Sequence, residues 1–315
     1  MSFEVCRMPD GSTIGYKLLG KEHAGAVLVM VTGMSAVMDD WMPLAECLAH
    51  TRRVLVFDHR GMGTSSMTTE QDEDITIELL SQDVLRLCNA LHVRHVHLLG
   101  FSMGGIIAQA ILTHPDARAT SDQAGVSVQG VEVRRVLLAA TFTKSPRTKF
   151  RADQVPVPEH ASWEERSLAY IRYILALQYH ADVLGDGKPL QPKFDERMRV
   201  GIHHKRPQTV IGYQAAAISR YANRDQLRHV PRNLPIAVIH GRHDQMVLYE
   251  ESNDILRFLP QAMRLYPNVA SPDDREAFAH MWFDYFDMER AWVVPIIKFL
   301  DAPVSARLYA SQLSL

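Results

Sequence analysis

Residues 98–105 read LLGFSMGG, and they place a single serine, Ser102, between an apolar run and a helix-like segment. Three glycines, Gly100, Gly104 and Gly105, flank this serine. Small neighbours are what a sharply strained backbone turn requires. Such a turn lifts the hydroxyl clear of the backbone, as a nucleophile needs, although a purely structural turn also uses glycine and tolerates serine. The rest of the chain decides between these two interpretations.

Apolar, β-branched runs alternate with helix-like segments along most of the chain. Continuous apolar runs are typical of strands buried on both faces of a parallel sheet, and strand–helix alternation implies right-handed crossovers. The sequence therefore predicts an α/β fold with a mostly parallel, doubly wound sheet, preceded by an antiparallel hairpin in the first twenty residues. The predicted strands are VLVMVT (27–32), VLVF (54–57), HVHLL (95–99), VLLAA (136–140) and IAVIH (236–240). The predicted helices between them cover residues 41–50, 75–91 and 103–114.

The alternation is interrupted between the last two predicted strands. Residues 144–230 begin with a loop rich in proline and charge and continue with helical patterns near 162–181, 194–204 and 207–222. We expect an inserted helical cap at 144–230 on a core formed by residues 1–143 and 231–315, because a separate domain is more often appended at an end. The polar residues 116–131 are expected to form a surface loop.

Composition excludes several classes of protein. The 315 residues are 47% hydrophobic with a formal net charge of -2, so the basic excess of nucleic-acid-binding proteins is missing. No apolar stretch reaches the 18 or so residues of a membrane span, and the N-terminus lacks the pattern of a secretory signal. The chain has 3 cysteines and no CxxC pair, which suits a reduced, cytoplasmic protein better than a disulfide framework or a metal site.

Several motifs together resemble the α/β-hydrolase superfamily. The segment around Ser102 is similar to its nucleophile elbow, G-x-S-x-G between a strand and a helix. Four further segments resemble family motifs in the family's order: VTGMSAVMDDW (31–41), FDHRGMGTSS (57–66), IHGRHDQMV (239–247) and FAHMWF (278–283). The resemblance implies a serine nucleophile with an acid and then a histidine downstream. A serine at the elbow argues against the dehalogenase and epoxide hydrolase branches, which use aspartate there.

The downstream acid and histidine are predicted from position. Asp244 follows a buried strand and a short turn, which places it at the same carboxyl edge of the sheet as Ser102. The preceding strand is followed by no carboxylate before Asp153, which is the alternative acid. His280 lies downstream of the acid, between a polar loop and an apolar segment, and it is the last of the 15 histidines.

Two backbone N–H groups are expected to bind the oxyanion that acyl transfer develops. The residue after the nucleophile, Met103, supplies one, and the resemblance assigns the other to Met34. Many relatives carry His-Gly at the start of this loop, whereas this chain has Thr32-Gly33, which puts the geometry of the loop in question.

The sequence thus predicts a serine hydrolase that cleaves a hydrophobic carboxylic ester through an acyl-enzyme, without a cofactor or a metal. Lactonase, thioesterase, amidase and C–C bond hydrolase activities use the same triad and stay open. A receptor-like binding protein of the same fold is the alternative from another class. The expected partner is a small-molecule ester or lactone, and a homodimer is left open. The expected substrate-binding residues are Gly33, Met38, Trp41, Met246 and, in the cap, Trp163. Two alternatives stay open for Tyr179, a further cap residue: it covers an acyl chain, or it fills the cap's own core.

Overall fold

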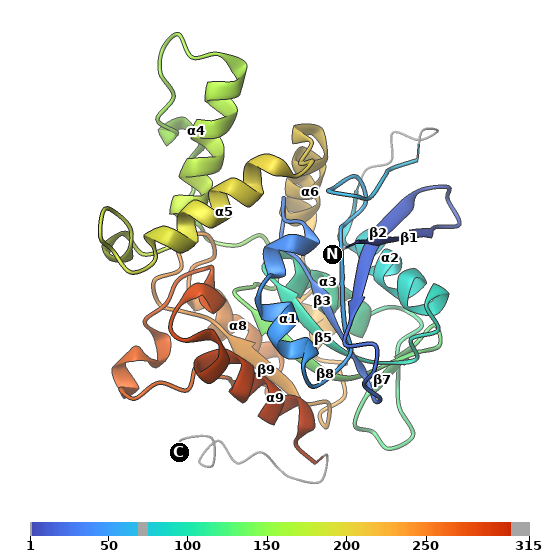
Figure 1. Cartoon of the computed structure of the whole chain (residues 1–315). Coiled ribbons are helices and arrows are strands. Elements are labelled where there is room, and N and C mark those ends of the chain that lie inside the picture. Colours follow the sequence, from blue (N-terminus) through green and yellow to red (C-terminus); the bar gives the residue numbers. More distant parts are fainter. Residues whose placement is uncertain (1, 69–74, 304–315) are drawn as a thin grey trace.

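A mostly parallel sheet forms the centre of the molecule (Figure 1). The structure, a computed structural model, describes residues 2–68 and 75–303. Within these residues the strand order is β1-β2-β4-β3-β5-β8, after which β8 pairs with both β7 and β9. The strands are β1 (Glu4–Arg7), β2 (Thr13–Leu19), β3 (Val27–Val31), β4 (Val54–Phe57), β5 (His95–Phe101), β6 (Arg118–Ala119), β7 (Val126–Val128), β8 (Val131–Ala139), β9 (Ile236–Ile239) and β10 (Met263–Arg264).

The pairing of these strands confirms the predicted fold class. Strands β4, β3, β5, β8, β9 and β10 are parallel to their neighbours in that order. Strands β1 and β2 form the expected antiparallel hairpin. The expected loop at 116–131 is wrong in part, because β6 and β7 form an antiparallel extension that continues onto β8. Val126 and Val128 are buried there, so two alternating valines outweigh the polar character of the segment.

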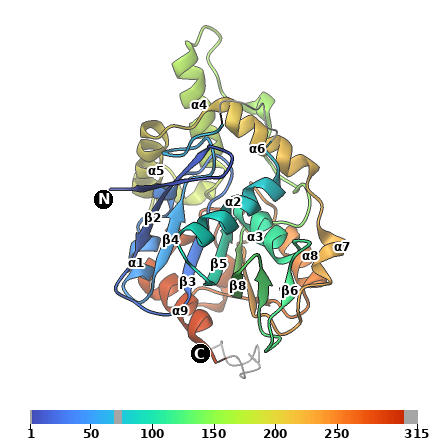
Figure 2. The same cartoon turned by 90° about the vertical axis from the view of Figure 1, so that its right-hand side faces the viewer.

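Helices cover both faces of the sheet and create two apolar layers (Figures 1 and 2). Strand β3 illustrates the division, since Val27, Val29 and Val31 belong to one layer and Leu28 and Met30 to the other. The first layer contains side chains of α2, α3 and α8, and the second contains those of α1 and α9. These helices are α1 (Leu44–Ala49), α2 (Ile77–Ala90), α3 (Met103–Leu112), α8 (Glu250–Phe258) and α9 (Val294–Asp301). No helix among the described residues is long and apolar enough to cross a membrane.

The segment from 144 to 230, called the cap segment below, lies at one end of the sheet. Its helices α4, α5 and α6 are grouped there, and α4 projects away from the rest of the molecule (Figures 1 and 2). The boundaries of the cap at 144 and 230 stay a prediction. The helices are α4 (Trp163–Ala176), α5 (Gln191–His203), α6 (Gln208–Arg220) and α7 (Arg224–Leu227). Short 3-10 helices are η1 (Met38–Trp41), η2 (Ala152–Gln154), η3 (Ala181–Val183), η4 (Pro272–Glu276) and η5 (Trp282–Asp284), and a π-helix, η6 (Met288–Val293), precedes α9.

A buried ion pair joins the cap segment to the core. The guanidinium of Arg197 on α5 donates from Nε and Nη2 to the two carboxylate oxygens of Asp284, at 3.0 and 2.8 Å. Tyr179 donates its hydroxyl to the same carboxylate at 2.6 Å, and Arg197 also bonds the carbonyl of Asp40. The side chain of Asp284 is 0% exposed and that of Arg197 7%. Tyr179 therefore binds a buried carboxylate, which gives its hydroxyl a structural partner.

Replacing Arg197 with methionine should destabilise the protein strongly, because the buried carboxylate of Asp284 would lose its charged partner. We expect the free energy of unfolding, measured by urea titration, to fall by about 3–5 kcal/mol. Arg199→Met is the matched control on the same helix, since Arg199 pairs with Glu196 in solvent with 64% of its side chain exposed. Equal stability of the two variants would contradict the role given to the buried pair.

Candidate active site

Ser102 is the single residue between the end of β5 and the start of α3. Its backbone angles are φ 54 and ψ -118, which lie in a region that non-glycine residues rarely occupy. The N–H of Ser102 donates to the carbonyl of Ala139 at 2.9 Å, and its carbonyl accepts from the hydroxyl of Thr141 at 2.6 Å. Both partners belong to the neighbouring strand β8 or its end, so the sheet holds the strained turn in place.

The glycines around Ser102 are required by close packing. A Cβ on Gly104 would overlap the carbonyl of Val31, and one on Gly105 would overlap the side chain of Thr141. A Cβ on Gly100 would overlap the backbone of Gly104 itself. Helix α3 can therefore approach β3 and β8 only because these positions carry no side chain. The first N–H groups of this helix point toward its N-terminal end, where they and the helix dipole favour negative charge.

Asp244 and His280 form a buried hydrogen-bonded pair. The Nδ1 atom of His280 lies 2.8 Å from Oδ2 of Asp244, and the two residues are 4% and 3% exposed. The other oxygen, Oδ1, accepts the backbone N–H groups of Met246 and Val247, each at 2.9 Å. The alternative acid, Asp153, lies exposed in η2. The structure thus joins the predicted acid to the predicted histidine.

The charge state of Asp244 fixes the tautomer of His280. Burial by itself raises the pKa of Asp244, but His280 and His240 outweigh this effect and lower the pKa to about 2. The carboxylate is therefore ionised at neutral pH and only accepts hydrogen bonds, so Nδ1 of His280 carries a proton. In the neutral imidazole this leaves Nε2 unprotonated, as a general base requires.

Two contacts at the site were not expected from sequence. The Nε2 atom of His240 lies 3.2 Å from Oδ2 of Asp244 and 2.9 Å from the carbonyl oxygen of Val247. Both neighbours are acceptors, so this nitrogen carries a proton and His240 supports the acid. The ring of His280 packs against Phe101, with 4.8 Å between the ring centroids, which brings the imidazole beside the residue that precedes Ser102.

The loop after β3 lies directly against the serine turn. A Cβ built on Gly33 would be only 3.2 Å from the Cβ of Ser102, so a larger residue would crowd the serine side chain. The carbonyl of Thr32 lies 3.1 Å from Nε2 of His59, a fully buried residue. Burial lowers the pKa of His59, which favours a neutral ring that donates from Nε2 to this carbonyl. His59 thereby supports the loop at the position where Thr32 replaces the usual histidine.

Asp58 holds the far end of the same loop. Its Oδ1 accepts the N–H of Met38 at 2.7 Å, while Oδ2 accepts both the N–H and the hydroxyl of Thr64, also at 2.7 Å. The motif at 57–66 was identified by resemblance, but the roles of Asp58 and His59 were not predicted. Only the fold brings residues 58 and 59 beside residues 32 and 38, since β3 and β4 are adjacent parallel strands.

The residues predicted to bind substrate lie in different surroundings. Met246 is half-buried beside the acid, and Gly33 adjoins the serine. Met38 and Trp41 are 3% and 1% exposed in the apolar layer, where Trp41 packs on Phe101 with 5.8 Å between the ring centroids. The side chain of Trp163 lies outside the described part of the structure. Their contact with substrate stays a prediction, as does that of the oxyanion donors Met34 and Met103.

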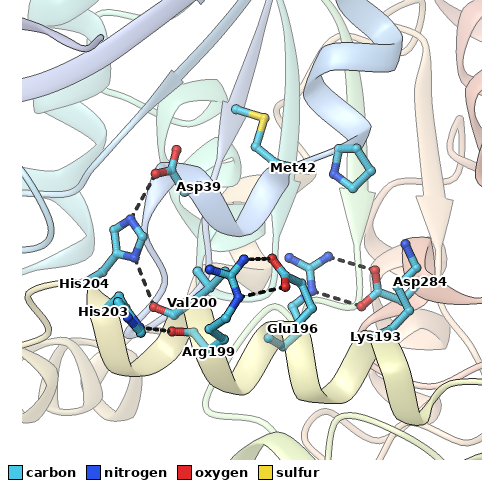
Figure 3. A pocket seen from close by; sticks show the side chains of 11 residues that line it. Asp39, Met42, Lys193, Glu196, Arg199, Val200, His203, His204 and Asp284 are labelled. Atoms are coloured by element: carbon cyan, nitrogen blue, oxygen red, sulfur yellow. Dashed lines mark hydrogen bonds and ion pairs between the residues drawn. The ribbon is translucent and has the colours of Figure 1, made fainter. Parts of the chain in front are cut away.

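A cavity of about 330 Å³ opens between α5 and the η1–α1 segment. Its lining is mostly charged, and much of the charge is paired internally: Arg199 pairs with Glu196 (Figure 3) and Arg197 with Asp284. Ser102 and His280 do not line it. The complete lining is Asp39, Met42, Pro43, Lys193, Glu196, Arg197, Arg199, Val200, His203, His204 and Asp284. The cavity therefore lies where the cap segment meets the core.

Comparisons with known proteins identify the fold family of the chain. Residues 26–270 match the family model described as alpha/beta hydrolase fold. The chain is 33% identical over 99 residues to the 3-oxoadipate enol-lactonase 1 of Acinetobacter baylyi, a match that covers 31% of this chain and 35% of the relative. The matched part therefore spans only about a third of that relative's length.

Two solved structures resemble the whole chain. A hydrolase from Pseudomonas aeruginosa has a TM-score of 0.70 and 22% identity, covering 96% of this chain and 99% of that one. The enol-lactonase from Burkholderia xenovorans has a TM-score of 0.69 and 20% identity, covering 94% and 99%. At these identities the likeness shows the fold alone.

Replacing Gly104 with alanine should destabilise the protein, because the new methyl group would meet the carbonyl of Val31. We expect the free energy of unfolding, measured by urea titration, to fall by about 1–3 kcal/mol. Gly212→Ala is the matched control: Gly212 is exposed on α6 with open space around it, so alanine should stabilise by up to about 1 kcal/mol. A stable Gly104→Ala protein would contradict the close approach of α3 to the sheet.

Proposed function

The chain belongs to the α/β-hydrolase fold family, and we propose that it hydrolyses carboxylic esters, lactones included, with Ser102 as nucleophile, His280 as base and Asp244 as orienting acid. The observation that carries the proposal is the buried hydrogen bond between His280 and Asp244, with the ring of His280 packed on Phe101, the residue before the strained Ser102. A polar pair this deeply buried is costly unless it is fully hydrogen-bonded. Catalysis explains why the fold keeps it.

The proposed reaction is acyl transfer in two halves. Nε2 of His280 takes the proton of Ser102 as Oγ attacks the carbonyl carbon, and Asp244 stabilises the imidazolium that forms. The carbonyl oxygen becomes an oxyanion, which the N–H groups of Met34 and Met103 bind. The C–O bond then breaks, and His280 returns the proton to the leaving alcohol. Water, activated by the same histidine, attacks the acyl-enzyme and releases the acid and Ser102.

The oxyanion role of Met34 and Met103 is supported by their hydrogen bonding. Among the described hydrogen bonds none uses the N–H of either residue, whereas neighbouring N–H groups at Ser35, Ala36 and Ser102 are engaged. Met103 begins α3, and Met34 follows Gly33, which adjoins Ser102. Two free N–H groups on the two chain segments nearest the nucleophile are what a developing oxyanion requires.

A lactone is the second candidate substrate class. It is favoured by the relative named as an enol-lactonase, which is 33% identical over a match that covers 31% of this chain. Ring opening uses the same steps, except that the leaving alcohol stays attached to the acyl group. Thioester, amide and C–C cleavage would use the same residues. A binding protein without turnover would have no need of the Asp244–His280 bond, so we place that alternative last.

Replacing Ser102 with alanine should abolish ester turnover, because no hydroxyl remains to form the acyl-enzyme. Hydrolysis of p-nitrophenyl esters from acetate to palmitate measures this, and the chain-length optimum gives the size of the acyl pocket. Lactones are assayed in parallel. Circular dichroism should show an unchanged fold. A residual activity above about a tenth of the wild-type rate would be too large for a lost nucleophile and would end the assignment.

The outcomes without turnover also discriminate. If the wild-type protein hydrolyses no p-nitrophenyl ester but a fluorophosphonate labels Ser102, the nucleophile is active and the cap segment restricts the substrate. Lactones, thioesters and diketones would then be the next substrates. If neither turnover nor labelling is found, the binding-protein alternative replaces hydrolysis.

Replacing Asp244 with asparagine should lower kcat by roughly 10³–10⁴-fold, by analogy with the loss of the orienting acid in a serine protease. The amide would favour the wrong tautomer of His280 and could not stabilise the imidazolium. Asp153→Asn is the matched control, since this exposed aspartate is the alternative acid of the sequence. Steady-state kinetics on the best p-nitrophenyl ester compares the two. A loss in Asp153→Asn, with Asp244→Asn unchanged, would move the acid.

A further inference from the structure

The cap segment hydrogen-bonds to Ser35 in the proposed oxyanion loop, the segment that follows β3 and contains Met34. The N–H of Ser35 donates to Oε1 of Gln214 on α6 at 2.9 Å, and its carbonyl accepts from Nη1 of Arg206 at 2.5 Å. Arg206 is itself paired with Asp40, with 3.0 Å between Nη1 and a carboxylate oxygen. Both backbone groups of one residue are thus bound by side chains of the cap segment. Ser35 directly follows Met34, the proposed oxyanion donor.

The backbone at Ser35 needs this support. The N–H of Ala36 donates to the carbonyl of Gly33 at 3.4 Å, which closes a turn with Met34 and Ser35 at its centre. Ser35 has φ 61, while Met34 has no positive φ. A positive φ at the third position of a turn is normal for glycine or asparagine and strained for serine. Without its two bonds Ser35 would favour a negative φ, which would reorient the Met34–Ser35 peptide.

The burial of Gln214 lowers the stability of the protein, which a merely structural role does not explain. Its side chain is 0% exposed, and among the described residues its Nε2 has no hydrogen-bond partner. An unpaired buried donor costs stability that an apolar residue of the same length would not. The bond from Ser35 fixes Oε1 as the atom facing the loop, so the amide cannot turn over to satisfy Nε2 without losing this bond.

We propose that Gln214, assisted by Arg206, is a positioning residue that holds the oxyanion loop in its active turn. The cap segment is then part of the apparatus that stabilises the transition state, in addition to covering the substrate. The N–H of Met34 lies between two fixed points, because His59 binds the carbonyl of Thr32 before it and Gln214 binds the N–H of Ser35 after it. This inference rests on the proposed function and deepens it.

Gln214→Met tests the inference, because methionine keeps the length of the side chain and removes the acceptor of the Ser35 N–H. We expect kcat for p-nitrophenyl acetate to fall about 10- to 100-fold, as displacement of a catalytic group by an ångström does, with KM changed less than about twofold. The affinity for a trifluoromethyl ketone, which forms an oxyanion on Ser102, should fall by a similar factor. The affinity for the product acetate should not change.

Gln208→Met is the matched control, since Gln208 begins the same helix and is exposed. It should retain the wild-type kcat and ketone affinity. A Gln214→Met protein with unchanged kcat would overturn the inference, as would a loss of kcat without a loss of ketone affinity, which marks a merely structural defect. If Gln214→Met does not fold, Gln214→Asn serves instead, because it keeps the amide and shortens its reach.

The wild-type protein gives an independent test. Amide hydrogen exchange followed by NMR should show the Ser35 N–H protected, and exchange at the rate of a free peptide would overturn the inference whatever the variants do. Failure of the proposed function is recognised separately. An active Ser102→Ala protein would disprove the assignment of Ser102 as nucleophile, and with it the proposed function. An inactive Ser102→Ala protein together with a fully active Gln214→Met protein would disprove only the role of Gln214.

Discussion

The close packing of α3 against the sheet is the constraint on which the site depends. Gly104 lies where the carbonyl of Val31 leaves no room for a side chain, so the helix begins almost in contact with β3. The chain has only one residue in which to turn from β5 into this helix, and that residue, Ser102, takes a strained φ of 54. The same approach brings Gly33, in the loop after β3, against the serine. The strained turn at Ser102 and the placement of the loop after β3 are two results of one packing contact.

Buried aspartates hold the loops that follow the strands. Asp58 binds the N–H of Met38 and the turn at Thr64, and Asp244 binds two N–H groups of its own loop together with His280. Each carboxylate is removed from water, which is costly, but each accepts several hydrogen bonds that offset the cost. Because the carboxyl ends of parallel strands meet at one edge of a sheet, these rigid loops converge there. Groups fixed in this way need no reorganisation as charge develops, which is the physical basis of transition-state stabilisation.

The fold and the pairing of Asp244 with His280 could be predicted from the sequence, whereas the residues that support the loops of the site could not. Buried strands and the glycines around Ser102 are visible because apolar runs and small residues have local causes, and the order of serine, aspartate and histidine led to the Asp244–His280 pair. The role of His59 was invisible, since the histidine that binds Thr32 comes 27 residues later and only strand pairing brings it there. Gln214 lies within the predicted helical pattern at 207–222, but its burial could not be predicted because it depends on how the cap segment packs. The valines of β7 were hidden in a polar segment for the same reason: their burial is set by the neighbouring strand β8.

The two halves of the proposed oxyanion hole are stabilised from different parts of the molecule. Ser102 and Ser35 both have a positive φ, a conformation that costs of order 1–3 kcal/mol in a non-glycine residue. At Ser102 the core opposes this cost, through hydrogen bonds to Ala139 and Thr141. At Ser35 the cap segment opposes it, through Gln214 and Arg206. A displacement of α6 would therefore release the loop that carries Met34, whereas the hydrogen bonds that hold Ser102 would remain. Under the proposed mechanism, the cap segment would thus act on the stabilisation of the transition state through this loop.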